Sequence, residues 1–149
     1  MVDAIGRYRQ SYRQYSPHPT MKTLTSFALC NTAPEIDYPR PDRLVSGNPK
    51  RSTWNHYEEQ GVSSGLWECE PGAWRIAFAD DKDEFFHVIS GRIRITDAQD
   101  VAREFGTGEA CVIPAGFTGL FEVIEHVRKH YVIIDRAAMH TTSNTTSPS

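Results

Sequence analysis

Two acidic residues, Asp80 and Glu84, have the spacing best suited to chemistry in this 149-residue chain. They lie between two apolar segments, and side chains alternate between the two faces of a strand. If residues 81–83 preserve that alternation, both carboxylates point to one side together with Phe78 and Phe86. Paired carboxylates can transfer protons as general acid and base. They can also bind hard cations such as Mn²⁺ or Mg²⁺, with waters or other residues completing the shell.

Aromatic residues accompany these carboxylates on the predicted inward face, and they are Trp74, Phe78, Phe86 and Phe121. One interpretation is an apolar cavity for a small organic ligand, with Asp80 and Glu84 at its mouth. The other is that the aromatic side chains simply fill the interior. Glu84 in such surroundings can serve as an acid or a base. Alternatively, Glu84 forms a salt bridge with an inward cation such as Lys129 or an arginine.

His56 is the one histidine that we consider for this site. It lies in Trp54-Asn-His-Tyr57, before the first strong apolar run. This segment can fold over the mouth and bring the imidazole to a ligand. The alternative is a histidine with no role in the site.

Short apolar runs separated by turns must position these side chains. Turn signals recur about every 8–12 residues, which is typical of an all-β sandwich or barrel. Ser90-Gly91 predicts a hairpin turn between two such runs, and the prolines between Pro34 and Pro49 predict an extended connector. The predicted strands cover residues 65–70, 73–79, 84–89, 92–96, 109–113, 117–124 and 127–134.

The composition is that of one globular domain, and it excludes several classes of function. The net charge is −3, with 39% hydrophobic and 23% charged residues. No apolar run approaches the roughly 20 residues of a membrane span, and a pI near 6.0 argues against nucleic-acid binding. We therefore expect a small-molecule ligand, with neither nucleic acid nor membrane as a partner.

We divide the chain into an N-terminal extension (1–42), a barrel (43–136) and a flexible Ser/Thr-rich tail (137–149). The Arg-rich start resembles a transit peptide in composition, whereas the alternatives are a disordered leader or a functional start at Met21. Without a secretory h-region, we expect a cytoplasmic protein.

The three cysteines are predicted to be small buried residues in a reducing compartment, with a catalytic thiol as the alternative. These cysteines are Cys30, Cys69 and Cys111.

The spacing of glycines, a proline and a glutamate resembles the two sequence motifs of the cupins. The first family motif runs Gly, five residues, His, one, His, three or four, Glu, six, Gly. Here the corresponding residues are Gly72, Phe78, Asp80, Glu84 and Gly91, and every spacing is kept. Both histidines of this motif are therefore replaced, and only the glutamate remains.

The second family motif runs Gly, five residues, Pro, one, Gly, two, His, three, Asn. The corresponding residues here are Gly108, Pro114, Gly116, Gly119 and Val123. Gly119 thus replaces the third histidine. It leaves space through which a substrate can approach the backbone.

The resemblance is closest to small single-domain cupins related to the (S)-ureidoglycine aminohydrolases. It rests on Leu66–Gly72, Gly108–Phe117 and Arg128–Tyr131. It implies an all-β jelly-roll barrel, a double-stranded β-helix, that takes a ureide-like or other small polar nitrogen compound.

Because the usual metal-binding histidines are replaced, the resemblance implies no particular activity. We expect no cofactor, with a weak Mn²⁺ or Mg²⁺ site at Asp80 and Glu84 as the alternative. An enzyme would be a hydrolase-like, aminohydrolase-like or isomerase-like cupin that uses Glu84. The alternatives are a metal-free binding or sensing cupin without catalysis and a structural dimer module.

A second apolar face predicts a subunit partner. Phe85, His87 and Ile89 lie on the face opposite Glu84, which makes this strand apolar on both sides. A strand that is apolar on both faces is buried on both. We therefore expect a homodimer.

Overall fold

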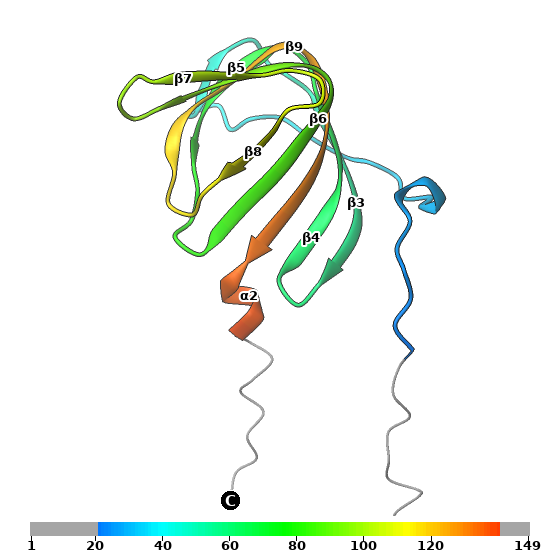
Figure 1. Ribbon diagram of the computed structural model, residues 1–149. Helices are drawn as coiled ribbons and strands as arrows, with labels where there is room; N and C mark the ends of the chain where they lie inside the picture. Colours follow the sequence, from blue (N-terminus) through cyan, green and yellow to red (C-terminus); the bar gives the residue numbers. More distant parts are fainter. Residues whose placement is uncertain (1–20, 141–149) are drawn as a thin grey trace, which may run out of the picture.

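The structure, a computed structural model, describes residues 21–140, and strands dominate that range (Figure 1). In chain order the strands are β1 (Glu35–Asp37), β2 (Leu44–Ser46), β3 (Arg51–Glu59), β4 (Val62–Cys69), β5 (Gly72–Ala77), β6 (Lys82–Asp97), β7 (Ala102–Phe105), β8 (Ala110–Ile113) and β9 (Thr118–Asp135). A 3₁₀ turn, η1 (Phe27–Leu29), precedes them, and a short helix, α2 (Arg136–His140), follows. The predictions for residues 1–20 and 141–149 lie outside the described residues.

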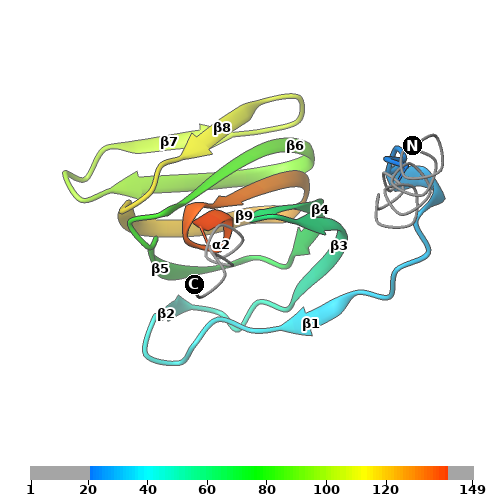
Figure 2. The ribbon, with the colours of Figure 1, turned by 90° about the horizontal axis from the view of Figure 1, so that it is seen from below.

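Two long strands, β6 and β9, organise the barrel as antiparallel neighbours over most of their length. Residues 84–87 of β6 pair with β8 on its other edge, and residues 93–96 pair with β7. Similarly, residues 127–134 of β9 pair with β4, and residues 118–123 pair with β5. Each long strand therefore pairs with three others, and the strands form one antiparallel sheet that curls around a common interior (Figures 1 and 2). The predicted all-β cupin barrel is confirmed.

The predicted hairpin at Ser90-Gly91 is wrong, because β6 continues through both residues. The register between β6 and β9 shifts between Val88 and Ile93, so the glycine lies in an irregular part of the ladder and not in a turn. Gly91 has φ +88°, and a Cβ there would lie 2.1 Å from the carbonyl oxygen of His126. Only glycine fits this close approach of two bending strands.

Strand β3 lies where the sequence analysis predicted no strand. It pairs with β4 along its length, and the register shifts so that Asn55 faces Gly65 whereas Tyr57 faces Ser64. His56 is therefore the extra residue of a β-bulge. A Cβ on Gly65 would lie 1.9 Å from the carbonyl oxygen of Trp54, so this position also requires glycine. The segment is consequently part of the barrel wall and not a flap over its mouth.

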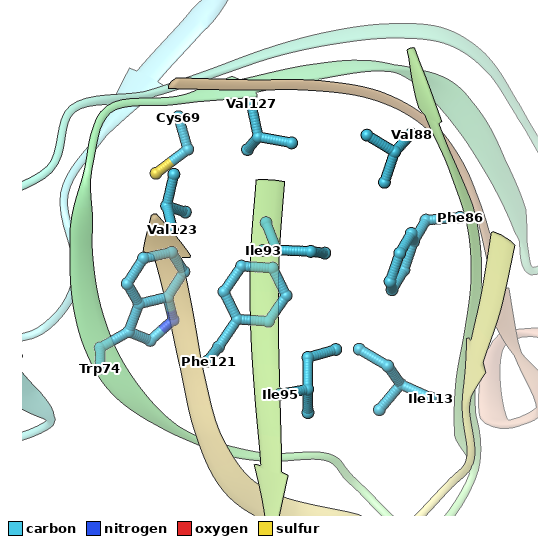
Figure 3. Close-up of a cluster of buried hydrophobic side chains, with 10 residues drawn as sticks. All are labelled: Cys69, Trp74, Phe86, Val88, Ile93, Ile95, Ile113, Phe121, Val123 and Val127. Carbon is cyan, nitrogen blue, oxygen red and sulfur yellow. The ribbon is translucent and has the colours of Figure 1, made fainter. Parts of the chain in front are cut away.

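The interior of the barrel is filled by apolar side chains from β4, β5, β6, β8 and β9 (Figure 3). They alternate with outward residues along each strand, as the pleat requires. This core consists of Cys69, Trp74, Phe86, Val88, Ile93, Ile95, Ile113, Phe121, Val123 and Val127. None of the helices between residues 21 and 140 has the length and apolarity to cross a membrane.

The outward face of β8, β6 and β9 carries exposed apolar side chains on three adjacent strands. Phe85 pairs in register with Val112 on one side, and Ile134 follows on β9. Their exposed fractions are 43%, 59% and 36%. Contiguous exposed apolar surface often marks a protein interface. We therefore expect the interface of the predicted homodimer to lie on this face. The dimer itself stays a prediction.

We expect Val112→Glu to convert the predicted dimer to a monomer, because it places a charge at the most exposed apolar residue of this face. Light scattering after size exclusion at micromolar concentration measures the mass. Val101→Glu, at another exposed valine outside this face, is the matched control and should leave the dimer intact. A wild-type protein that runs only as a monomer would contradict the assignment.

Candidate ligand site at the barrel mouth

A lysine lies inside the barrel, and its partner is Glu84. Lys129 comes from β9 and Glu84 from β6, two strands that are paired in register. The Lys129 Nζ atom lies 3.4 Å from Glu84 Oε2, and the two side chains are only 4% and 14% exposed. A buried charge is strongly disfavoured unless it is paired. The two side chains must therefore stay close together in the folded protein.

Three aromatic rings complete the environment of the ammonium. The Lys129 Nζ atom lies 4.4 Å from the ring centroid of Phe86, 4.5 Å from that of Trp67 and 5.2 Å from that of Phe121. The faces of aromatic rings carry partial negative charge and attract a cation within about 6 Å. Trp74 extends this group, with its ring centroid 5.0 Å from that of Phe121.

An open pocket of about 390 Å³ lies beside this ion pair, with Glu84 in its wall. Its lining is dominated by hydrogen-bond acceptors, because it includes three carboxylates and one amide. The lining residues are Glu35, Thr53, Asn55, Glu58, Ser63, Trp67, Glu84, Tyr131 and Ile133. Such an open hollow, with several polar groups in its wall, can admit a small polar molecule.

A hydrogen-bonded chain orders the polar wall of this pocket. The Tyr131 hydroxyl donates to Asn55 Oδ1 at 2.8 Å, and Asn55 Nδ2 donates to Glu58 Oε2 at 3.0 Å. Burial, and then the nearby charges of Glu58, Glu84 and Glu35, raise the pKa of Tyr131 to about 12. Tyr131 therefore keeps its proton at neutral pH, and its oxygen retains lone pairs for a ligand donor.

The two carboxylates chosen from the sequence are not brought together in one pocket. Glu84 lines the pocket, whereas Asp80 is exposed in the turn before β6, where its Oδ1 lies beside Gly116. Asp80 does not contribute to the pocket wall. Lys129 is the residue that joins Glu84, as the salt-bridge alternative predicted.

The residues around Glu84 do not fit a metal ion. Within residues 21–140, no group of three histidine, cysteine, aspartate or glutamate side chains is placed to hold one. The ammonium of Lys129 already pairs with Glu84.

The predicted aromatic ligand contacts lie elsewhere in the barrel. Trp74, Phe86 and Phe121 belong to the filled core, and Phe78 packs against it (Figure 3). The opening expected at Gly119 is filled, because a Cβ there would lie 2.2 Å from the Thr96 carbonyl oxygen. None of these five residues lines the pocket beside Glu84. Their roles in ligand binding stay predictions.

His56 points away from the Glu84 pocket. Its ring centroid lies 5.0 Å from that of Phe27 in η1, on the outer side of the barrel. It lines a wider hollow of about 880 Å³ between residues 21–25 and the β3–β4 hairpin, where Lys22 pairs with Glu59. We place the candidate site at Glu84 because a charged pair and ordered polar groups converge there.

Two of the three cysteines are poor candidates for a nucleophile. Burial raises the pKa of the Cys69 thiol to about 12, and its Sγ atom donates to the Glu70 carbonyl oxygen. Burial also raises the pKa of Cys111. Because a thiolate is the reactive form, these protonated thiols are unreactive at neutral pH.

Sequence reasoning missed most of the polar wall. Trp67 and Tyr131 lie in the segments that carried the family resemblance, and alternation with Lys129 on β9 gives Tyr131 its inward direction. Asn55 could not be placed, because β3 was not predicted. The acceptor-rich pocket follows from the pairing of β3, β4 and β9.

Substitution of Glu84 should destabilise the protein more than substitution of Lys129. We expect Glu84→Gln to lower the free energy of unfolding by about 3 kcal/mol, because it leaves a buried ammonium without its carboxylate. Lys129→Met should cost about 1 kcal/mol or less, since Glu84 borders the pocket and water can hydrate it. Urea unfolding at pH 7 measures both values. A larger loss in Lys129→Met than in Glu84→Gln would contradict this description.

Comparison with known proteins identifies the family of this chain. The model of the EutQ-like cupin domain matches residues 57–131, which is 75 of the 149 residues. The EutQ protein of Clostridium difficile is 23% identical, with a TM-score of 0.53 over 67% of this chain and 81% of that chain. A putative ethanolamine utilization protein Q from Salmonella typhimurium is 15% identical, with a TM-score of 0.53 over 71% and 98% of the two chains.

A protein of unknown function from Pseudomonas syringae has a TM-score of 0.61 at 21% identity, over 70% of this chain. The match spans 45% of that protein's length. No curated protein matches this chain. At these identities the solved structures show likeness of fold alone. The family match and the fold together show that the chain belongs to the cupins, as a EutQ-like cupin domain.

Proposed function

We propose that this cupin binds a small, N–H-rich organic compound, either an amine or a ureide, in the pocket beside Glu84. The observation that carries the proposal is the chemistry of the pocket wall. Glu35, Glu58 and Glu84 supply three carboxylates, while Lys129, which pairs with Glu84, does not line the pocket. Such a wall favours ligands that donate hydrogen bonds or carry positive charge.

Glu84 is the central acceptor in this proposal. Its Oε2 atom faces Lys129, and no hydrogen bond among residues 21–140 uses Oε1. A ligand N–H can therefore bond to Oε1 while the ion pair holds the carboxylate in place. Charge-assisted hydrogen bonds of this kind are about twice as strong as neutral ones.

Two independent resemblances agree with this ligand class. The sequence motifs resemble ureidoglycine aminohydrolase cupins, whose name describes a ureide. A solved neighbour is named as a putative ethanolamine utilization protein, and ethanolamine is a small ammonium compound at neutral pH. Both compounds are rich in N–H donors. Allantoin and ethanolamine are therefore suitable probes.

If the bound compound is also transformed, Glu84 is the group that we assign to proton transfer. It is the carboxylate that borders both the pocket and an ammonium. Asp80, exposed in its turn, is the weaker candidate of the two. Binding without turnover, as in a sensing cupin, uses the same contacts.

We expect titration calorimetry of the full chain to show saturable binding of ethanolamine or allantoin. Glu58→Gln should raise the Kd about tenfold, the effect of weakening one charge-assisted contact. Glu58 is exposed, so this variant should fold normally. Glu125→Gln, an exposed glutamate outside the pocket, is the matched control.

Ethylene glycol, which is similar in size to ethanolamine but lacks an amine, should not bind. The proposal would be refuted by the absence of saturable binding for both probes, or by equal affinities of the Glu58→Gln and Glu125→Gln variants. Turnover of a bound probe that is unchanged in Glu84→Gln would rule out the proton-transfer role.

A further inference from the structure

A second pocket, of about 210 Å³, lies on the side of the barrel between the β1–β2 connection and β5. Figure 2 shows β2 beside β5 on this side. Four arginines line the pocket together with apolar surface from Trp74 and Phe78, and they are Arg40, Arg43, Arg51 and Arg75. Of the residues that the structure describes, no aspartate or glutamate is part of this wall.

Two of the four arginines already have carboxylate partners outside the wall. Arg51 donates from Nε and Nη2 to the two carboxylate oxygens of Asp37, at 2.9 and 2.6 Å. Arg40 donates to Asp42 at 2.8 Å. The guanidinium carbon of Arg51 also lies 5.4 Å from the ring centroid of Trp74. These pairs contribute no net charge to the pocket.

Arg43 and Arg75 are different, because neither has an ion pair within residues 21–140. Most other described arginines do have one, for example Arg94, which pairs with Glu104 and Glu122. The Arg75 N–H donates to the Arg43 carbonyl oxygen at 2.9 Å, so the two residues lie side by side across the β2–β5 pair. Like charges opposite each other on paired strands destabilise the structure. A bound anion would remove this repulsion.

The exposed edge of β5 adds a backbone donor to the same pocket. The Phe78 N–H points toward β9, where it donates to the Phe117 carbonyl oxygen, and the Arg75 N–H points the opposite way, toward β2. By alternation, the Ala77 N–H also points to the β2 side. Strand β2 pairs with β5 only at Ala73 and Trp74, so no described strand covers this edge at Ala77. Ala77 lines the pocket.

We propose that this pocket binds the carboxylate or phosphate group of a small organic anion. The guanidinium groups of Arg43 and Arg75 supply paired N–H donors that match such oxyanions. The Ala77 N–H supplies a further donor, and Trp74 and Phe78 form an apolar wall for the organic part. This site is separate from the acceptor-rich pocket beside Glu84, and it takes ligands of opposite charge.

Phenyl phosphate and benzoate test the site, because each joins an oxyanion to an aromatic ring, and inorganic phosphate tests the anion alone. We expect saturable binding of at least one of them to the full chain by calorimetry at low ionic strength. In Arg75→Gln the affinity should fall about tenfold or more, and in Arg43→Gln/Arg75→Gln binding should be lost. Arg103→Gln is the matched control, since Arg103 also lacks an ion pair within the described residues but lies outside the pocket.

Thermal unfolding gives a second readout, and its measurement without anion does not depend on the affinity. Without anion, Arg75→Gln should unfold at the same or a higher temperature than the wild type, because repulsion is removed. With anion, only the wild type and Arg103→Gln should be stabilised. An unchanged affinity in Arg75→Gln, an equal loss in Arg103→Gln, or no saturable binding of any probe would overturn the proposal. Glu58→Gln should bind these anions normally, so failure at either pocket is distinguishable from failure at the other.

Discussion

Lys129 places a positive charge inside a barrel that is otherwise filled by apolar side chains, and the arrangement around it follows from that charge. An isolated ammonium in such a place would be far too unfavourable to persist. Glu84 must therefore lie within reach, and aromatic faces must surround the remaining directions. This requirement couples the mouth of the barrel to its core, because Phe86 and Phe121 belong to the core and also contact the ammonium that pairs with Glu84.

The two long strands provide the rigidity that this pair needs. Glu84 is on β6 and Lys129 on β9, and these strands are paired along most of their length. Their bends depend on close backbone approaches such as the one at Gly91, where a side chain would collide with the neighbouring strand. The polar wall comes from β3 and β4, which extend the same sheet. Core, ion pair and pocket are therefore parts of one continuous arrangement.

Sequence reasoning predicted the fold because turn residues at fixed spacing constrain strand length, and the motif glycines lie where backbones must turn or approach. It failed at Gly91, since a Ser-Gly pair between β-rich runs has the same composition in a bulge as in a hairpin. It also missed β3, whose inward residues Thr53 and Asn55 are polar because they face the pocket. Polar inward residues hide the apolar alternation by which strands are identified.

The candidate site was predictable only in part, for a related reason. Glu84 and Lys129 could be paired on chemical grounds, as a carboxylate in need of a cation. The contacts of Tyr131 with Asn55, and of Arg43 with Arg75, join residues far apart in the sequence. They depend on strand register, which composition does not determine. Asp80, in contrast, was predicted in the site although it lies outside the pocket, because it is exposed in a turn.

The buried ammonium of Lys129 can be observed directly by nuclear magnetic resonance of the side-chain Hε and Nζ groups of the lysines. Lys129→Met identifies the signal. Because the ammonium lies over the faces of Trp67, Phe86 and Phe121, ring currents should move the Lys129 Hε resonances well upfield of those of the exposed lysines. Glu84→Gln should shift its Nζ resonance. A Lys129 signal that coincides with those of the exposed lysines, and that does not respond to Glu84→Gln, would contradict the account.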